Sequence, residues 1–154
     1  MLTSMELSQN PGLLLHKIGS MMEHMSDNVL FENFGIGFSQ FKILFVLENH
    51  QSIQQKEIAL YLGQTEASVS RQVKLLKQAG FIDIAVGKDD RKKRIITLTK
   101  KGSIVACESF NILNNFYQPI LSSLGPNEQL EMARMLGKVH DRLNETCEYL
   151  ARSE

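Results

Sequence analysis

The polar and charged residues that suit a functional site lie in two segments near the middle of this chain. The first segment, residues 54–74, combines amide, hydroxyl and cationic side chains with one small alanine: Gln54, Gln55, Lys56, Thr65, Ala67, Ser68, Ser70, Arg71 and Lys74. A guanidinium such as that of Arg71 can pair with two acceptors of guanine or with a phosphate, whereas Lys74 suits a phosphate. This combination predicts contact with a nucleic acid, and the alternative is an ordinary solvated helix face.

The second segment is a run of basic residues interrupted by aspartates. Its candidate site residues are Lys88, Asp90, Arg91, Lys92, Lys93 and Arg94. A narrow minor groove of DNA has an enhanced negative potential, which attracts inserted Arg or Lys side chains. The aspartates suit a turn and can hold an arginine in one orientation. The segment therefore predicts a second nucleic-acid contact, with a solubilising loop as the alternative.

The distribution of charge agrees with this interpretation, although the net charge of the whole chain is zero. Residues 38–102 contain nine Lys and three Arg against three Glu and three Asp, a net charge of +6. The rest of the chain holds five basic and eleven acidic residues, a net charge of −6. A basic middle between acidic ends is typical of a phosphate-facing module attached to an acidic scaffold.

Patterns typical of catalysis or metal binding are missing from the sequence. We find no Ser/His/Asp arrangement, no glycine-rich phosphate loop and no metal-ligand spacing, so we expect neither an enzyme nor a bound cofactor or metal. Cys107 and Cys147 are expected to be small core or interface residues rather than oxidation sensors. No apolar run approaches the roughly 18–20 residues that span a bilayer, and no secretory signal is visible. We therefore expect a cytoplasmic protein without membrane contact.

The elements that would position the two segments can be predicted from helix signals. A first helix is expected over residues 11 to about 33, and Ser39 is expected to cap the next helix. A short helix over residues 55–62 ends at Gly63, and Thr65 is placed to cap a second helix with Gly80 just after its end. Three apolar residues at helical spacing must face inward in that second helix: Val69, Val73 and Leu76. The polar residues of the first segment then lie on its outer face.

A β-hairpin and two further helices complete the prediction. Residues 82–86 and 94–99 are β-prone and flank the second segment, and a hairpin directly after a helix-turn-helix is a wing. Helices are expected from residue 101 or 102 to 121 and from Pro126 onward. With the first helix, they carry more apolar surface than a small module can cover, so a second copy of the chain is the expected partner.

The predicted fold class is mainly α, a winged helix-turn-helix with a two-stranded β wing. This DNA-binding domain is expected at residues 38–102, between a dimerisation helix in residues 1–37 and two dimerisation helices in residues 103–154.

Several short motifs in this region together resemble the MarR family of bacterial regulators. They are QKEIA at residues 55–59, SVSR at 68–71, LKQAGFI at 76–82, and DRK at 90–92 followed by LTKKG at 98–102. The resemblance implies a homodimer with one recognition helix per subunit in the major groove, wings in flanking minor grooves and a pseudo-palindromic target. It also implies a repressor released by a small ligand, often an aromatic acid, or by cysteine oxidation. The family's wing usually reads Asp-x-Arg, which leaves Arg91, the preferred candidate, and Lys92 as alternatives for the minor-groove side chain.

A ligand pocket is expected where the dimerisation helices meet the winged domain. Its candidate lining residues are Met22, Met25, Phe34, Phe38 and Phe41, with plain core packing as the alternative.

A second hypothesis for the whole protein is a winged-helix module that binds a protein partner through its basic face, such as an anti-repressor or polymerase accessory.

Overall fold

The computed structural model describes residues 10–50, 52–86 and 94–151. By its internal contacts the chain divides into two compact units, Met1–Asn114 and Asn115–Glu154, which we describe separately. The three-part domain organisation expected from the sequence stays a prediction. The first unit contains the small sheet and the helices that pack on it, so it holds most of the candidate site residues.

The first described helix, α2 (Pro11–Phe34), begins and ends where the sequence predicts. The Asn10 side chain accepts a hydrogen bond from the Leu13 backbone N–H at 3.1 Å, Pro11 occupies the first turn, and Gly35 ends the helix with φ of 66°. Only Ser26 and Leu30 of α2 are buried. Part of the apolar surface that the sequence predicts for this helix stays accessible, because Leu14 and Ile18 are 40% and 44% exposed.

Helix α3 (Phe38–Asn49) forms the centre of the first unit, and its beginning corrects one prediction. Gly37 rather than Ser39 is the N-cap residue, because the Gly37 backbone N–H donates to Gln40 Oε1 at 2.9 Å. Asp27 of α2 accepts from the Phe38 backbone N–H at 2.6 Å and ties the two helices together. Ser39 therefore lies inside the first turn. Five residues of α3 are buried: Phe41, Ile43, Leu44, Val46 and Leu47.

The predicted helix-turn-helix is confirmed. Helix α4 (Gln55–Leu62) ends at Gly63, whose φ of 60° is favoured by glycine. Helix α5 (Glu66–Gln78) begins at the N-cap Thr65, whose hydroxyl accepts from the Ser68 backbone N–H at 3.2 Å. Gly80, with φ of 75°, follows the end of α5. The two helices are therefore bounded by the residues that the sequence indicated.

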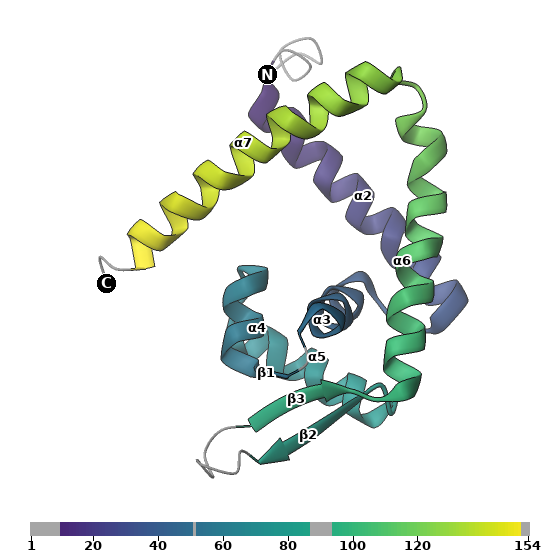
Figure 1. The fold of residues 1–154 in the computed structure, drawn as a ribbon, viewed down its shortest axis with the longest axis vertical. Helices are drawn as coiled ribbons and strands as arrows, with labels where there is room; N and C mark the ends of the chain where they lie inside the picture. Colours follow the sequence, from purple (N-terminus) through teal and green to yellow (C-terminus); the bar gives the residue numbers. More distant parts are fainter. Residues whose placement is uncertain (1–9, 51, 87–93, 152–154) are drawn as a thin grey trace, which may run out of the picture. The chain divides into compact units, whose positions relative to one another are not determined.

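The sheet has one strand more than predicted. The expected hairpin strands are β2 (Ile82–Val86) and β3 (Arg94–Leu98), and a third strand, β1 (Ile53–Gln54), pairs with β3 in the antiparallel order β1-β3-β2. Ile96 of β3 lies opposite Ile53 on one side and Ile84 on the other. Helices α3, α4 and α5 group beside this sheet (Figure 1). The fold class predicted from the sequence is confirmed, with β1 as an addition.

The chain continues with helices α6 (Lys100–Leu121) and α7 (Pro126–Ala151), which confirms the two predicted C-terminal helices. Helix α6 begins one residue before the expected range, and it buries Gly102, Ala106, Ser109 and Leu113. Pro126 stands at the start of α7, where Glu128 accepts from the Gly125 backbone N–H at 2.7 Å. Among the described residues, no single helix meets the length and hydropathy needed to cross a membrane, whereas α2 and α3, bent by 77°, pass that test only as a pair.

Candidate nucleic-acid interface

Helix α5 separates an apolar inner face from a polar outer face. Val69, Val73 and Leu76 are 0%, 3% and 0% exposed, so the predicted inward positions are confirmed. Because a helix has 3.6 residues per turn, burial of these positions turns the intervening positions outward. Four candidate site residues are exposed on α5: Ala67, Ser70, Arg71 and Lys74. One continuous helix therefore presents small side chains and two cations to solvent.

The first turn of α5 contains the two remaining hydroxyl candidates. Thr65 is exposed, and its hydroxyl accepts from the Ser68 backbone N–H, so it caps the helix. Ser68 itself is half-buried. The uncapped N–H groups of a first helical turn, together with the helix dipole, favour a negatively charged group nearby.

The candidate residues at the start of α4 are arranged by a capping box. The Gln54 backbone N–H donates to Glu57 Oε2 at 2.8 Å, which closes the first turn. Gln54 also lies in β1, opposite Ile95 of β3, so this end of α4 is attached to the sheet. Gln54 and Gln55 are half-buried and Lys56 is exposed. Lys56 is thus the residue of this group that can reach a phosphate most freely.

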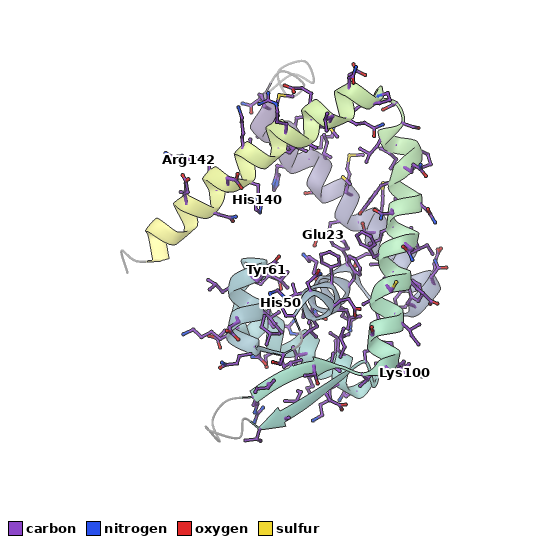
Figure 2. All side chains as sticks on the ribbon, viewed as in Figure 1. Glu23, His50, Tyr61, Lys100, His140 and Arg142 are labelled. Atoms are coloured by element: carbon purple, nitrogen blue, oxygen red, sulfur yellow. The ribbon has the colours of Figure 1, made fainter. Side chains whose placement is uncertain are left out.

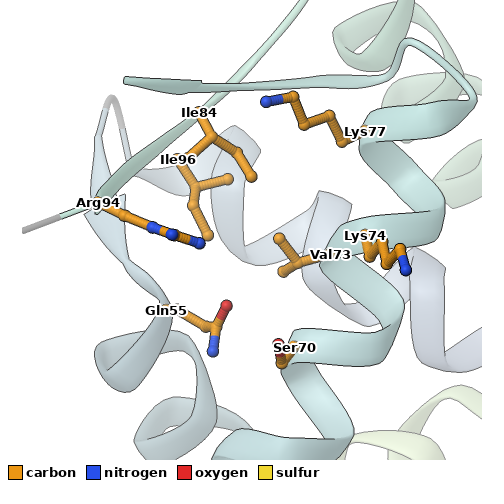
Figure 3. Close-up of a pocket in the computed structure, with 8 residues that line it drawn as sticks. All are labelled: Gln55, Ser70, Val73, Lys74, Lys77, Ile84, Arg94 and Ile96. Carbon is orange, nitrogen blue, oxygen red and sulfur yellow. The ribbon is translucent and has the colours of Figure 1, made fainter. Parts of the chain in front are cut away.

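A hollow of about 270 Å³ brings both predicted segments together. Its lining residues come from α4, α5 and the sheet: Gln55, Ser70, Val73, Lys74, Lys77, Ile84, Arg94 and Ile96. Figure 3 shows Arg94 extending from β3 into the space that Gln55 and Val73 approach from the helices. Three cations around a small hollow create a positive potential that attracts an anion.

Lys77 is a candidate that the sequence analysis missed. It lines the hollow with Lys74 and is exposed. The signal was available, because residues three apart in a helix share a face and Lys77 follows Lys74 by three positions.

The tip of the wing lies outside the described residues. This applies to Lys88, Asp90, Arg91, Lys92 and Lys93, so the choice between Arg91 and Lys92 stays open. Arg94 is described, and it is exposed in β3 opposite Val86 of β2. The paired strands therefore place Val86 and Arg94, which flank the undescribed residues, opposite each other.

The residues predicted to line a ligand pocket differ in their surroundings. Phe41 is buried, Met25 is exposed, and Met22, Phe34 and Phe38 are half-buried. The Phe38 and Phe41 rings stack with centroids 5.8 Å apart, and Phe41 also contacts Phe45 at 5.9 Å. Two of the five candidates thus contact each other through their rings, and the pocket itself stays a prediction.

Among the side chains that the structure describes, the cysteine and histidine residues form no second site. Cys107 is exposed, so it is not a core residue of the single chain, and the side chain of Cys147 lies outside the described part. His50 packs edge-on against Tyr61 with ring centroids 5.6 Å apart (Figure 2). Within residues 10–50, 52–86 and 94–146, no group of three His, Cys, Asp or Glu side chains is arranged to hold a metal ion.

Comparisons with known proteins agree on the kind of module. Residues 34–93 match the model of the family described as MarR family. The chain is 27% identical over 121 residues to the HTH-type transcriptional regulator MgrA of Staphylococcus aureus, covering 79% of this chain and 81% of that protein. It is 32% identical over 90 residues to the HTH-type transcriptional regulator YwoH of Bacillus subtilis, covering 57% of this chain and 65% of that protein. The structure is similar to that of the S. aureus MepR–DNA complex, with a TM-score of 0.77 and 26% identity. The match covers 87% of this chain and 98% of that chain.

Proposed function

This chain belongs to the MarR family of winged-helix transcription regulators, and from that premise we propose that it binds double-stranded DNA sequence-specifically as a homodimer. The observation that carries the proposal is the outer face of α5, where Ser70, Arg71 and Lys74 are exposed opposite a fully buried apolar face. A helix with such a polar outer face fits the major groove of DNA when the rest of its domain leaves that face exposed. The similarity to a structure solved with DNA supports this use of the fold.

The exposed residues divide into those that would identify the sequence and those that would hold the backbone. Arg71 is long enough to reach guanine O6 and N7, and the neighbouring Ala67 and Ser70 leave room for the helix to approach. Lys56 and Lys74 suit phosphates on either side of the groove. Arg94 and the basic residues of the wing tip would then contact a neighbouring minor groove.

The exposed apolar surface of the helices outside the winged module supports the homodimer. Helix α2 exposes Leu13, Leu14, Leu15, Ile18 and Met21, and α7 exposes Leu130, Met135, Leu136, Val139 and Leu143. Single chains in water rarely keep contiguous apolar faces of this extent uncovered. Burial against a second copy would remove them from water and would make the DNA target pseudo-palindromic.

The regulatory part of the proposal is a repressor whose DNA binding responds to a small aromatic ligand. Its candidate site residues are Met22, Met25, Phe34, Phe38 and Phe41, and the stacked rings of Phe38 and Phe41 support an aromatic ligand. A thermal-shift screen with phenolic acids and with peroxide tests this part. A compound that raises the melting temperature and weakens DNA binding is the expected result, and stabilisation without any effect on DNA binding would contradict it.

The DNA-binding proposal is tested by selecting duplexes from a randomised pool and measuring affinity at several salt concentrations. We expect enrichment of a two-fold symmetric sequence and a steep loss of affinity with salt, because each neutralised phosphate releases counterions. Failure to enrich any duplex would contradict the proposal. Retention of a protein partner through Lys56, Arg71 and Lys74, without DNA affinity, would instead favour the protein-binding hypothesis.

A further inference from the structure

Thr99, between β3 and α6, and Lys101, in the first turn of α6, bind three consecutive backbone carbonyl groups that follow helix α5. Lys101 Nζ donates to the Ala79 carbonyl at 2.9 Å, Thr99 Oγ1 donates to the Gly80 carbonyl at 2.8 Å, and the Thr99 backbone N–H donates to the Phe81 carbonyl at 3.0 Å. These carbonyls lie beyond Gln78, the last residue of α5, so the hydrogen bonds of the helix do not satisfy them. Here the partners come from a segment about twenty residues later in the chain.

The Thr99 hydroxyl joins two helices directly. It donates to the Gly80 carbonyl after α5, and it accepts from the Gly102 backbone N–H in the first turn of α6 at 3.0 Å. Thr99 therefore acts as an N-cap for α6 while it satisfies the Gly80 carbonyl, two residues after the end of α5. One hydroxyl fixes both helix ends at the same point.

Lys101 adds a further hydrogen bond to this connection, although its position in α6 is unfavourable for a cation. A cation in the first turn of α6 lies at the unfavourable end of that helix dipole. Its ammonium instead reaches the carbonyl end of α5, where a cation is favourable, and lies 4.6 Å from the centre of the buried Phe81 ring. The orientation of Lys101 is thus determined by α5 and Phe81.

Gly102 brings the two backbones into direct contact. A Cβ atom at this position would lie 1.9 Å from the Phe81 carbonyl oxygen and 2.8 Å from its carbonyl carbon. Since both close atoms belong to the backbone, no rotation of a side chain could relieve the contact. The absence of a side chain at Gly102 therefore lets the first turn of α6 lie directly against the backbone of Phe81, three residues after the end of α5.

We propose that Thr99, Lys101 and Gly102 form a junction that fixes the direction of α5 relative to α6 and so positions the recognition helix for its half-site. The inference rests on the proposed function, since it requires a dimer that binds DNA. Helix α6 exposes Ile104 and Phe110, apolar side chains that a second copy would cover. A rigid junction transmits the geometry of the dimer to both α5 helices. The three residues are positioning residues that need not contact DNA, and they determine which spacing between half-sites the dimer accepts.

The test compares Thr99→Val, which removes both side-chain hydrogen bonds at nearly constant shape, with Thr99→Ser, which keeps the hydroxyl. The probes are the duplex selected by the unchanged protein and versions with one base pair inserted or deleted between its half-sites. We expect Thr99→Val to lower the preference for the original spacing by about three- to tenfold, the factor expected for one or two hydrogen bonds, while Thr99→Ser retains it. Lys101→Met should act in the same direction, and Lys100→Met removes an equal charge from the adjacent position as the control.

A second measurement tests the junction in the absence of DNA, through the distance between the two α5 helices. A spin label on Glu66→Cys, in protein carrying Cys107→Ser and Cys147→Ser, reports the distance between the two α5 helices of a dimer. We expect Thr99→Val to broaden that distance distribution and Thr99→Ser to leave it unchanged. An unchanged width together with an unchanged spacing preference would overturn the proposed junction, even if Thr99→Val lowered the melting temperature. A dimer that selects no duplex would contradict the DNA-binding proposal alone, because the spin-label distances would still report on the junction.

Discussion

At the scale of single residues, Arg71 is the side chain whose chemistry can be tested most directly. Its position on α5 is exposed, and its neighbours Val69 and Val73 fix the helix from the opposite side. Replacement by alanine is expected to weaken binding to the selected duplex by about 1–3 kcal/mol, the usual contribution of an arginine that pairs with guanine. Competition gel shifts against random-sequence duplex measure this loss.

Arg71→Lys is the informative control, because it keeps the positive charge but loses the planar pair of donors. If Arg71 contacts a base, the lysine variant should lose specific affinity while its affinity for random-sequence duplex stays close to that of the unchanged protein. Equal affinity of the unchanged protein and both variants would instead assign Arg71 to the solvated face of α5.

Residue-level predictions from the sequence are confirmed where helical spacing alone decides burial, and they stay predictions where burial depends on a second chain. The buried positions of α5 follow from their period alone, whereas Leu14 and Ile18 of α2 are exposed in the described part of the chain. Cys107 is exposed in the single chain, so the core alternative is wrong for it and the interface alternative stays a prediction. Lys77 was missed although its spacing from Lys74 places both on one face of α5, and the hollow that the two residues line shows why that face matters.

At the scale of elements, the cap of α5 connects local stability with function. Thr65→Ala removes the hydroxyl that accepts from the Ser68 backbone N–H, and it is expected to lower the free energy of unfolding by about 0.5–2 kcal/mol. Thr65→Ser keeps an acceptor at this position and should cost much less. Urea unfolding followed by circular dichroism measures both variants. A loss of equal size in the two variants would show that the methyl group of Thr65, rather than its cap, carries the effect.

The boundaries of most elements were predictable because their signals are local. Gly63, Thr65, Gly80 and Pro126 each favour one backbone conformation or one capping bond, and the structure uses them there. Strand β1 was not predictable in this way, because two residues carry no pattern and Ile53 is in a strand only through its pairing with Ile96. The prediction of Ser39 as the cap of α3 was wrong for a related reason. The first backbone N–H groups of this helix donate to the side chains of Gln40 and of Asp27 in α2.

At the scale of the whole molecule, the proposed dimer makes DNA affinity depend on apolar residues far from any base. Leu14→Glu together with Ile18→Glu places two charges on the exposed face of α2. If that face is buried against a second copy, the variant should sediment as a monomer, because an unpaired charge in an apolar interface costs several kcal/mol. Its affinity for the symmetric duplex should fall with the loss of the second half-site contact, while its helix content stays unchanged.

Leu60→Glu is the matched control for this experiment, since Leu60 is 80% exposed on α4 and is not part of the proposed dimerisation helices. It introduces the same kind of charge at an exposed leucine of the winged module, so the dimer should persist. Sedimentation velocity at several protein concentrations distinguishes the two variants. A dimer that survives the changes in α2 but dissociates with Leu60→Glu would move the interface from the long helices to α4. The two recognition helices would then need a different arrangement to reach successive grooves of one duplex.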